Sequence, residues 1–357
     1  MAFDLRVEYL REEHIDSYVA LSRAEYGEHA AVSQPDHLRW KFLQNPQGRT
    51  MGVHLYRDSE LVGRMVALAR KFVYRGQVYT AAHIVDFLVH PSARGMPALM
   101  QLVIGLKQLS GFDLLLIMAP NPAGAAVWEK FVKMPGYFDL DTAVVPLQPA
   151  AVLQATGKLR TGAFGKLLDF PARFLAGGGA WLGAAMSCAR VETEWPSANE
   201  LDQLVSRDWG DRVVGYRSAE FLRWRYSYGP IFRYHVLFLR EGGELKGYLV
   251  TRRTVHDGLD CLFLVDAFGV PELASGSWRG ATMRELARAS FGGAELVMLL
   301  GNTSWGPLSE VGAFPFVRVP PRLLPRKTTV YAQWVTKPGF EISRDNFYCA
   351  LGDSDVI

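Results

Sequence analysis

The sequence predicts an α/β protein of two similar domains, each a mixed, mostly antiparallel sheet flanked by helices. Three observations support this prediction. Apolar segments of strand length alternate with segments of helical periodicity along the first half of the chain. Motifs of the first half recur in the second half at a nearly constant spacing. A chain of 357 residues is also long enough for two domains.

The clearest local signal lies in the stretch 80–109. An apolar run rich in β-branched residues ends at Val89, and His90-Pro91 interrupts it, because proline cannot continue a strand ladder. Apolar residues then follow the i, i+3, i+4, i+7 spacing of one helix face. These residues are Leu99, Leu102, Val103 and Leu106. The stretch therefore predicts a strand, a tight turn and a helix.

Similar patterns predict the elements on either side of this stretch. The predicted strands are 3–9, 52–57, 61–69, 114–119 and 140–147, and the predicted helices are 13–26 and 123–133.

The turn between the central strand and its helix has the chemistry of a phosphate site. The first backbone N–H groups of a helix have no partner within the helix, and the helix dipole favours anions there. Arg94 adds a positive charge, and Gly95 allows close approach of a ligand to the backbone. A cofactor with a diphosphate group is the ligand that this combination favours.

Three pairs of residues recur at a spacing of 184 positions, which indicates a tandem duplication. The pairs are Trp40 with Trp224, Pro46 with Pro230 and Gly63 with Gly247. Val85-Asp86 recurs as Val265-Asp266 at a spacing of 180, as a shorter hairpin would produce. A duplicated Trp beside a duplicated Pro is interpreted as a packing feature.

The duplication predicts a domain at 1–148, a linker at 149–189 and a second domain at 190–357. The linker mixes basic and apolar residues, and we expect its helices to pack on the domains. A helix lying on a membrane surface is the alternative.

Composition limits the class of protein. With 49% hydrophobic and 21% charged residues, the chain has the balance of a soluble globular protein. A net charge of +3 is too small to favour nucleic acid as a partner. Three widely separated cysteines suggest neither a disulfide framework nor a metal site, and no apolar run reaches the roughly 18 residues of a membrane span. A cytoplasmic location is the expectation.

Residues 89–99, VHPSARGMPAL, resemble motif A of the GNAT (GCN5-related) N-acyltransferases. In that family an R-G-x-G-x-G/A loop binds the pyrophosphate of acetyl-CoA. The pantetheine arm inserts where the motif A strand splays from its neighbour. This chain has Pro97 and Leu99 where the family has its second Gly and third small residue. The resemblance covers 3–147 and 190–335, and it implies that acetyl-CoA or another acyl-CoA binds the first domain. The implied cofactor-binding residues are Phe87, Leu88, Val89, Arg94, Gly95, Met96, Pro97, Ala98, Leu99 and Asn121.

Acyl transfer to an amine needs a bound thioester, a base or water path for the amine proton, and donors for the developing oxyanion. Asp86 is the candidate base. His83 and His90 are alternatives, and the recurrence of Asp86 as Asp266 leaves a structural role open.

The resemblance implies an acid on the helix that follows the second splayed strand, usually a Tyr. This chain has Trp128 there, so the candidate acid is Tyr137, which is near in sequence.

The function implied by the resemblance is transfer of an acyl group from acyl-CoA to the amine of a small molecule. An amino sugar in surface polysaccharide biosynthesis is the acceptor implied by similar tandem proteins. Two alternatives stay open. One is a Fem-type aminoacyl ligase, which doubles the same fold. The other is a non-catalytic binding or scaffold protein with decayed acyl-CoA sites.

Overall fold

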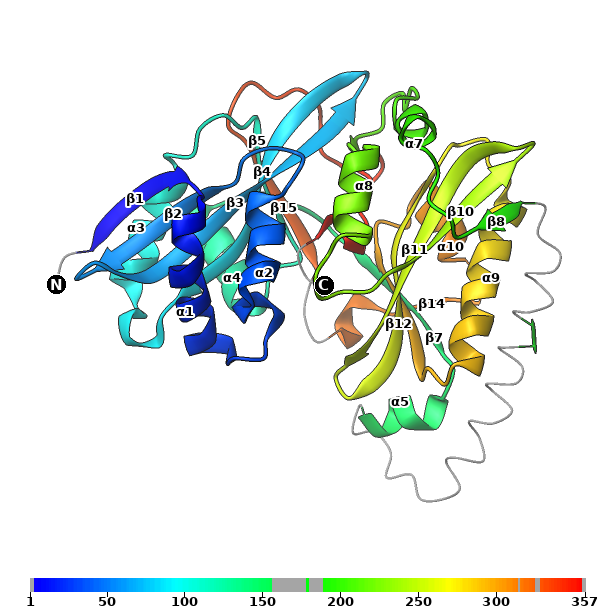
Figure 1. Ribbon diagram of the computed structural model, residues 1–357, viewed down its shortest axis with the longest axis horizontal. Helices are drawn as coiled ribbons and strands as arrows, with labels where there is room; N and C mark the ends of the chain where they lie inside the picture. Colours follow the sequence, from blue (N-terminus) through cyan, green and yellow to red (C-terminus); the bar gives the residue numbers. More distant parts are fainter. Residues whose placement is uncertain (1–2, 156–177, 180–188, 314, 325–327, 355–357) are drawn as a thin grey trace. The chain divides into compact units, whose positions relative to one another are not determined.

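The computed structural model describes residues 3–155, 178–179, 189–313, 315–324 and 328–354. The chain forms two compact units, and each takes segments from both halves of the sequence (Figure 1). Unit 1 comprises Met1–Phe138, Asp208–Phe232 and Arg326–Asn346. Unit 2 comprises Asp139–Arg207, Arg233–Pro325 and Phe347–Ile357.

Unit 1 contains a mixed sheet with the strand order β1-β2-β3-β4-β5-β15-β6. Strands β1 to β4 pair antiparallel, β4 pairs parallel with β5, and β5 pairs antiparallel with β15. The bounds are β1 Asp4–Tyr9, β2 Met51–Arg57, β3 Glu60–Tyr74, β4 Gln77–Val89, β5 Leu114–Met118, β15 Thr329–Trp334 and β6 Gly136–Asp139. The short strand β9 (Val214–Gly215) also pairs with β3.

Helices cover both faces of this sheet (Figure 1). One apolar cluster packs beneath α1 (Ile15–Tyr26) and α2 (Pro35–Leu38). A second packs beneath α3 (Met96–Leu106) and includes Trp128, in the π-helical turn Trp128–Val132 that follows α4 (Pro122–Val127). Each face of the sheet therefore has its own core, as strands with few exposed residues require.

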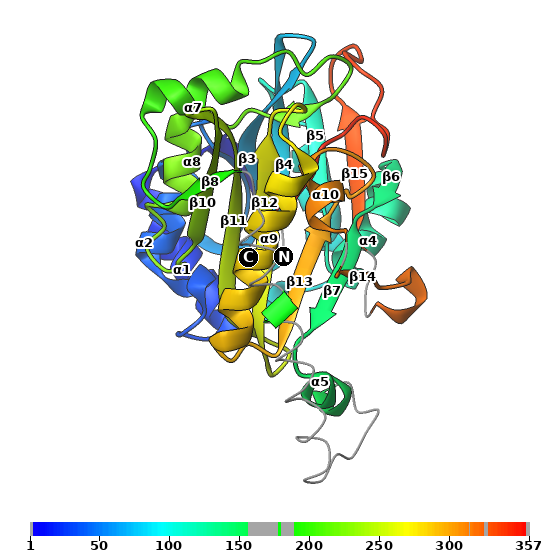
Figure 2. The ribbon, with the colours of Figure 1, turned by 90° about the vertical axis from the view of Figure 1, so that its right-hand side faces the viewer.

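Unit 2 contains a second mixed sheet, with the order β8-β10-β11-β12-β13-β7-β14. Helix α9 crosses one face of this sheet (Figure 2). The strands are β8 Arg190–Glu192, β10 His235–Glu241, β11 Glu244–His256, β12 Leu259–Gly269, β13 Leu296–Gly301, β7 Asp141–Pro146 and β14 Val317–Arg318. The helices are α5 Pro149–Ala155, α7 Ala198–Val205, α9 Ser275–Phe291 and α10 Pro307–Val311.

The two sheets repeat one topology. In each, four antiparallel strands lead to one parallel pair, β4 with β5 or β12 with β13, and an antiparallel strand follows. Strands β2 and β10 have the same length and start 184 residues apart, while α3 and α9 start 179 residues apart. The predicted fold class is confirmed.

The predicted domain boundaries need correction, because the two sheets exchange strands. Strand β7, at the predicted 140–147 position, pairs with β13 in unit 2 instead of completing the first sheet. Strand β15, from the second half, pairs with β5 in unit 1. An apolar strand pattern shows that a segment is buried but does not name its partner.

The predicted linker 149–189 begins with α5, and most of the remainder, 156–177 and 180–188, lies outside the described residues. In the described part of the chain, no helix is long and apolar enough to cross a membrane.

The two tryptophans that stand 184 positions apart pack against each other inside unit 1. Trp40 lies in the π-helical turn after α2, and Trp224 lies in α8 (Ala219–Tyr226). Their rings stack with centroids 5.0 Å apart, and each indole N–H donates to the backbone carbonyl of the other residue at 2.9 Å. The interpretation of this pair as a packing feature is confirmed.

Candidate cofactor site

The two parallel strands of unit 1 pair over only part of their length. Strand β4 pairs with β5 at Ala81–Leu114, Ala82–Leu115 and His83–Leu116. Beyond these pairs, β4 continues to Val89 and β5 to Met118 without pairing to each other. The strands thus diverge beside Phe87, Leu88 and Val89, where the resemblance implies that the pantetheine arm inserts.

A β-bulge lies at the point of divergence. Arg64 of β3 pairs with Leu88, but Val66 pairs with Val85, so two residues of β4 face Met65 alone. Asp86 has a φ of 49°, in the left-handed region. A bulge takes backbone groups out of the regular ladder and re-aims them, and bulges are frequent beside active sites.

The N-terminus of α3 offers unpaired backbone donors. Gly95, at the N-cap, has a φ of 150°, which favours glycine, and no side chain caps the helix. In the described structure, the N–H groups of Gly95, Met96 and Ala98 donate to no protein acceptor. A Cβ added to Gly95 would have only Pro97 within 4 Å, so the backbone is open to a ligand. Pro97 itself has no N–H to contribute.

Two arginines lie beside this turn. Arg94 donates to the carboxylate of Glu25 and to the carbonyl of Val89 at 3.3 Å. Arg57, at the end of β2, donates to the hydroxyl of Ser92 at 2.9 Å. No local sequence pattern marks Arg57, because it is 35 residues from Ser92 and only the pairing of β2 in the sheet brings it here.

Two further residues singled out by the resemblance follow β5: Asn121, an implied cofactor-binding residue, and Trp128, at the position of the implied acid. Asn121 caps α4, because its side-chain oxygen accepts the N–H of Gly124 at 2.7 Å. Trp128 is buried, and its ring lies 6.0 Å from that of Phe87. An indole N–H donates hydrogen bonds but does not release its proton near neutral pH.

Tyr137 lies on β6, at the edge of the first sheet. Strand β15 separates β6 from β5, which places β6 about 10 Å from β5 at ordinary strand spacing. The structure therefore does not bring Tyr137 to the divergence of β4 and β5, and its role as an acid stays a prediction.

Asp86 is held by two cations. Its carboxylate accepts from Lys41 Nζ and from the Arg64 guanidinium, each at 3.1 Å, and its side chain is only 10% exposed. Burial alone would raise the pKa of Asp86, but Lys41 and Arg64 outweigh burial and lower this pKa. A carboxylate with a lowered pKa is a weak base. Asp86 as the catalytic base stays a prediction, and its surroundings favour a role in holding the bulge.

A buried polar cluster adjoins this ion pair. Arg64 donates to the carbonyl of Tyr18 at 2.7 Å, and the Tyr18 hydroxyl lies 2.8 Å from Nε2 of His54. Glu8 lies 3.3 Å from Nδ1 of His54 and 3.6 Å from Nε2 of His14.

The spacing of Glu8, His14 and His54 would suit a metal ion, but the hydrogen bonds favour another arrangement. The backbone N–H of Arg11 donates to Nδ1 of His14 at 3.0 Å. Nδ1 is then an acceptor, so Nε2 carries the proton and faces Glu8. The cluster is therefore best described as a hydrogen-bonded network.

This network predicts that the protein loses stability in mild acid. Burial, followed by the nearby His14, lowers the pKa of His54 from 6.5 to about 4. Between these values the unfolded chain binds the proton and the folded chain does not. The contribution of neutral His54 to the free energy of unfolding is therefore fully present above pH 6.5. As the pH falls toward 4, the free energy of unfolding decreases by up to about 3 kcal/mol. Burial also lowers the pKa of His83, so His83 adds to the loss of stability as the pH falls.

Urea unfolding at pH 7 and pH 5 tests this prediction. His54→Gln should reduce the difference in stability between the two pH values, while His29→Gln, at an exposed histidine, should leave it unchanged. An equal difference in wild type and His54→Gln would contradict the assignment.

In unit 2 the corresponding divergence is filled by the chain itself. Strands β12 and β13 pair parallel only from Cys261–Leu296 to Leu264–Leu299. Beyond them, the N–H of Asn302 donates to the carbonyl of Cys349 at 2.7 Å, and the Tyr348 hydroxyl donates to the carbonyl of Ala267. The C-terminal segment thus bonds to both sides of this divergence, where β4 and β5 of unit 1 do not pair with each other.

The N-terminus of α9 has an acidic side chain beside it. The hydroxyl of Ser277 donates to the carboxylate of Glu241, which places a negative charge where a phosphate would bind. Trp278 is buried against Gly269, whose Cβ, if present, would lie 2.7 Å from the indole. The start of α9 in unit 2 therefore has a carboxylate close by and a buried indole behind it, which makes it a poorer phosphate site than the start of α3.

Comparison with known proteins indicates which fold these features belong to. No protein-family model matches the chain, and no curated protein matches its sequence. Among solved structures, a probable N-acyltransferase of Enterococcus faecalis aligns with a TM-score of 0.60 at 10% identity, over 93% of this chain and 72% of that one. A GCN5-related N-acetyltransferase of Anabaena variabilis aligns with a TM-score of 0.57 at 10% identity, over 93% and 73%. N-myristoyltransferase of Saccharomyces cerevisiae, solved with myristoyl-CoA, also gives 0.57, at 11% identity over 92% and 78%. The chain therefore has the fold of the GNAT-type N-acyltransferases.

Proposed function

We propose that this protein is an acyl-CoA-dependent N-acyltransferase that arose by tandem duplication and binds its cofactor in unit 1. The observation that carries the proposal is the continuity of two features. The divergence of β4 from β5 leads directly into a helix N-terminus with unpaired N–H donors. An acyl-CoA needs both an apolar slot for its arm and donors for its pyrophosphate.

In this proposal the cofactor supplies the thioester, and the chain supplies positioning. The N–H groups of Gly95, Met96 and Ala98 would hold the pyrophosphate, with Arg57 and Arg94 nearby as cations. A phosphate bound at this helix terminus would compete with the carboxylate of Glu25 for the guanidinium of Arg94.

At the bulge, backbone N–H groups freed from the ladder would donate to the oxyanion. Asp86 is a weak base and Trp128 does not release a proton, so orientation and N–H donation would supply most of the rate acceleration. The amine of a small molecule is the acceptor class that we propose.

Binding and turnover are tested separately. Thermal shift with acetyl-CoA, octanoyl-CoA and free CoA should show stabilisation, since a ligand at 100 times its Kd adds about 2.7 kcal/mol. Release of free thiol should then require an added amine. No stabilisation by any of the three compounds would overturn the proposal.

A second candidate is a protein that binds acyl-CoA without turnover. Trp128 favours it, because the position that the family uses for an acid holds a residue that cannot act as one. Binding without thiol release for a broad panel of amines would support this second candidate.

A further inference from the structure

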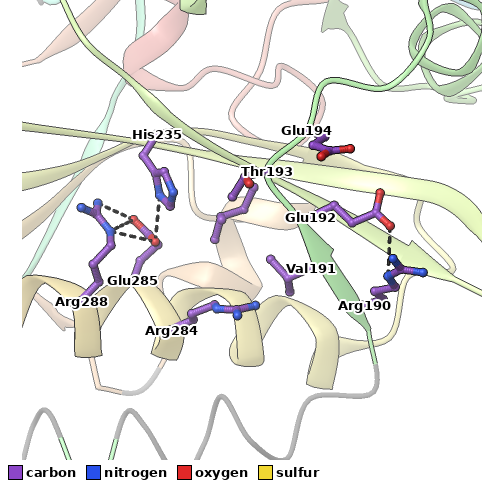
Figure 3. A pocket seen from close by; sticks show the side chains of 10 residues that line it. Arg190, Val191, Glu192, Thr193, Glu194, His235, Arg284, Glu285 and Arg288 are labelled. Atoms are coloured by element: carbon purple, nitrogen blue, oxygen red, sulfur yellow. Dashed lines mark hydrogen bonds and ion pairs between the residues drawn. The ribbon is translucent and has the colours of Figure 1, made fainter.

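Unit 2 contains a cavity of about 610 Å³ between β8, β10 and α9 (Figure 3). This volume is in the usual range for small-molecule sites. The cavity is lined by Arg190, Val191, Glu192, Thr193, Glu194, His235, Leu237, Arg284, Glu285 and Arg288.

In unit 1 the equivalent region, between α3 and β2, is a packed apolar core. There α3 approaches β2 so closely that a Cβ on Gly105 would lie 2.3 Å from Val53. Met51, Leu106 and Leu109 are buried in the same cluster. With the offsets of 184 for the strand and 179 for the helix, unit 2 replaces four of these five residues by polar ones. The replacements are His235 for Met51, Arg284 for Gly105, Glu285 for Leu106 and Arg288 for Leu109.

These replacements explain why the cavity exists. An arginine at the position of Gly105 prevents the close helix-to-strand contact of unit 1. Strand β8 also pairs with β10 only at Phe238, Leu239 and Arg240, so it leaves the edge beside His235 and Leu237 uncovered.

His235 is oriented by a buried carboxylate. The side chain of Glu285 is 1% exposed, and it accepts from Thr251 Oγ1 at 2.6 Å, Arg288 at 2.7 Å and His235 Nδ1 at 3.1 Å. Burial alone would raise the pKa of Glu285, but these hydrogen bonds lower it to about 2. The ionised carboxylate keeps the proton of His235 on Nδ1, so Nε2 of the neutral ring is an acceptor.

Among the described residues that line this cavity, Arg284 is the cation that remains available. Its guanidinium extends into the cavity from α9 (Figure 3), and it has no hydrogen bond or ion pair with any described residue. Arg288 is bonded to Glu285, and Arg190 to Glu192 at 3.1 Å. Glu194, also on the cavity wall, would disfavour a second anionic group.

We propose that this cavity binds a small organic carboxylate that also carries a hydroxyl group. The carboxylate matches the planar fork of Arg284, and the hydroxyl donates to Nε2 of His235. Val191 and Leu237 provide the apolar wall for the carbon chain. This site is independent of the cofactor site proposed for unit 1.

Ligand-observed NMR with the full chain at neutral pH tests the proposal. The probes are 3-hydroxybutyrate, butyrate and inorganic phosphate, each up to about 20 mM, well above the millimolar Kd expected for ligands of this size. We expect 3-hydroxybutyrate to bind at least about threefold more tightly than butyrate, as one hydrogen bond allows. Phosphate should bind more weakly than either.

Two variants and one control assign the binding to this cavity. Arg284→Met should abolish binding of both carboxylates, and His235→Phe should remove the preference for 3-hydroxybutyrate. Arg279→Met, at another exposed position of α9, is the matched control and should bind as wild type does. Unchanged melting temperatures would show that the variants fold. Wild-type binding by Arg284→Met, equal or tighter binding of phosphate, or no binding of either carboxylate by the wild type would overturn the proposal.

Discussion

Gly95→Val is expected to lower the affinity of the protein for coenzyme A by about a hundredfold or more. The φ of 150° at Gly95 strains a β-branched side chain, so the N-cap backbone would shift. A shift that misaligns two N–H donors removes about 3 kcal/mol, since a hydrogen bond to a charged group contributes about 1.5–3 kcal/mol. Isothermal titration calorimetry with coenzyme A measures the loss.

The matched control is Gly276→Val, in the first turn of α9. A Cβ at Gly276 meets nothing within 4 Å, so this variant should fold normally. Its affinity for coenzyme A should equal that of the wild type, because the proposed site is in unit 1. A loss of binding in Gly276→Val but not in Gly95→Val would place the cofactor in unit 2.

Asp86→Asn is expected to destabilise unit 1 by about 3–5 kcal/mol, the usual cost of removing one partner from a buried ion pair. Lys41 and Arg64 are each buried, and Asp86 is the acidic partner of both. Asparagine tolerates the left-handed backbone of this position, so the effect isolates the lost charge. Urea unfolding followed by tryptophan fluorescence reports the change.

Asp58→Asn serves as the control for this substitution. Asp58 has a similar φ of 51° but lies in an exposed turn between β2 and β3. We expect a change within about 0.5 kcal/mol, as for most surface substitutions. If both variants unfold at the wild-type urea concentration, the carboxylate of Asp86 does not stabilise the bulge.

The sequence was sufficient to predict the strand, turn and helix around Gly95. Their signals are local, because the apolar pattern of a strand, the periodicity of a helix and the residues of a turn each extend over only a few positions. The spacing between Trp40 and Trp224 likewise predicted a duplication, and the two sheets repeat one strand topology.

The chemistry around Asp86 was not predictable in the same way. The local sequence around a strand aspartate is the same whether its side chain faces solvent, a substrate or two cations. Lys41 is 45 positions away and Arg64 is 22, and only the packing of the π-helical turn 39–43 and of β3 against β4 brings them to the carboxylate. That packing converts a candidate base into a paired ion.

The sequence by itself determined the type and order of the elements, because each depends on short windows of residues. Only the tertiary structure decided which strands pair, so that β7 and β15 exchange between the sheets. It also decided that the C-terminal segment bonds across the divergence of β12 and β13, whereas in the described structure β4 and β5 do not pair with each other at the same point. The physical reason is that segments far apart in sequence compete to pair with a strand or to fill a cavity. No local sequence pattern shows which of these segments will do so.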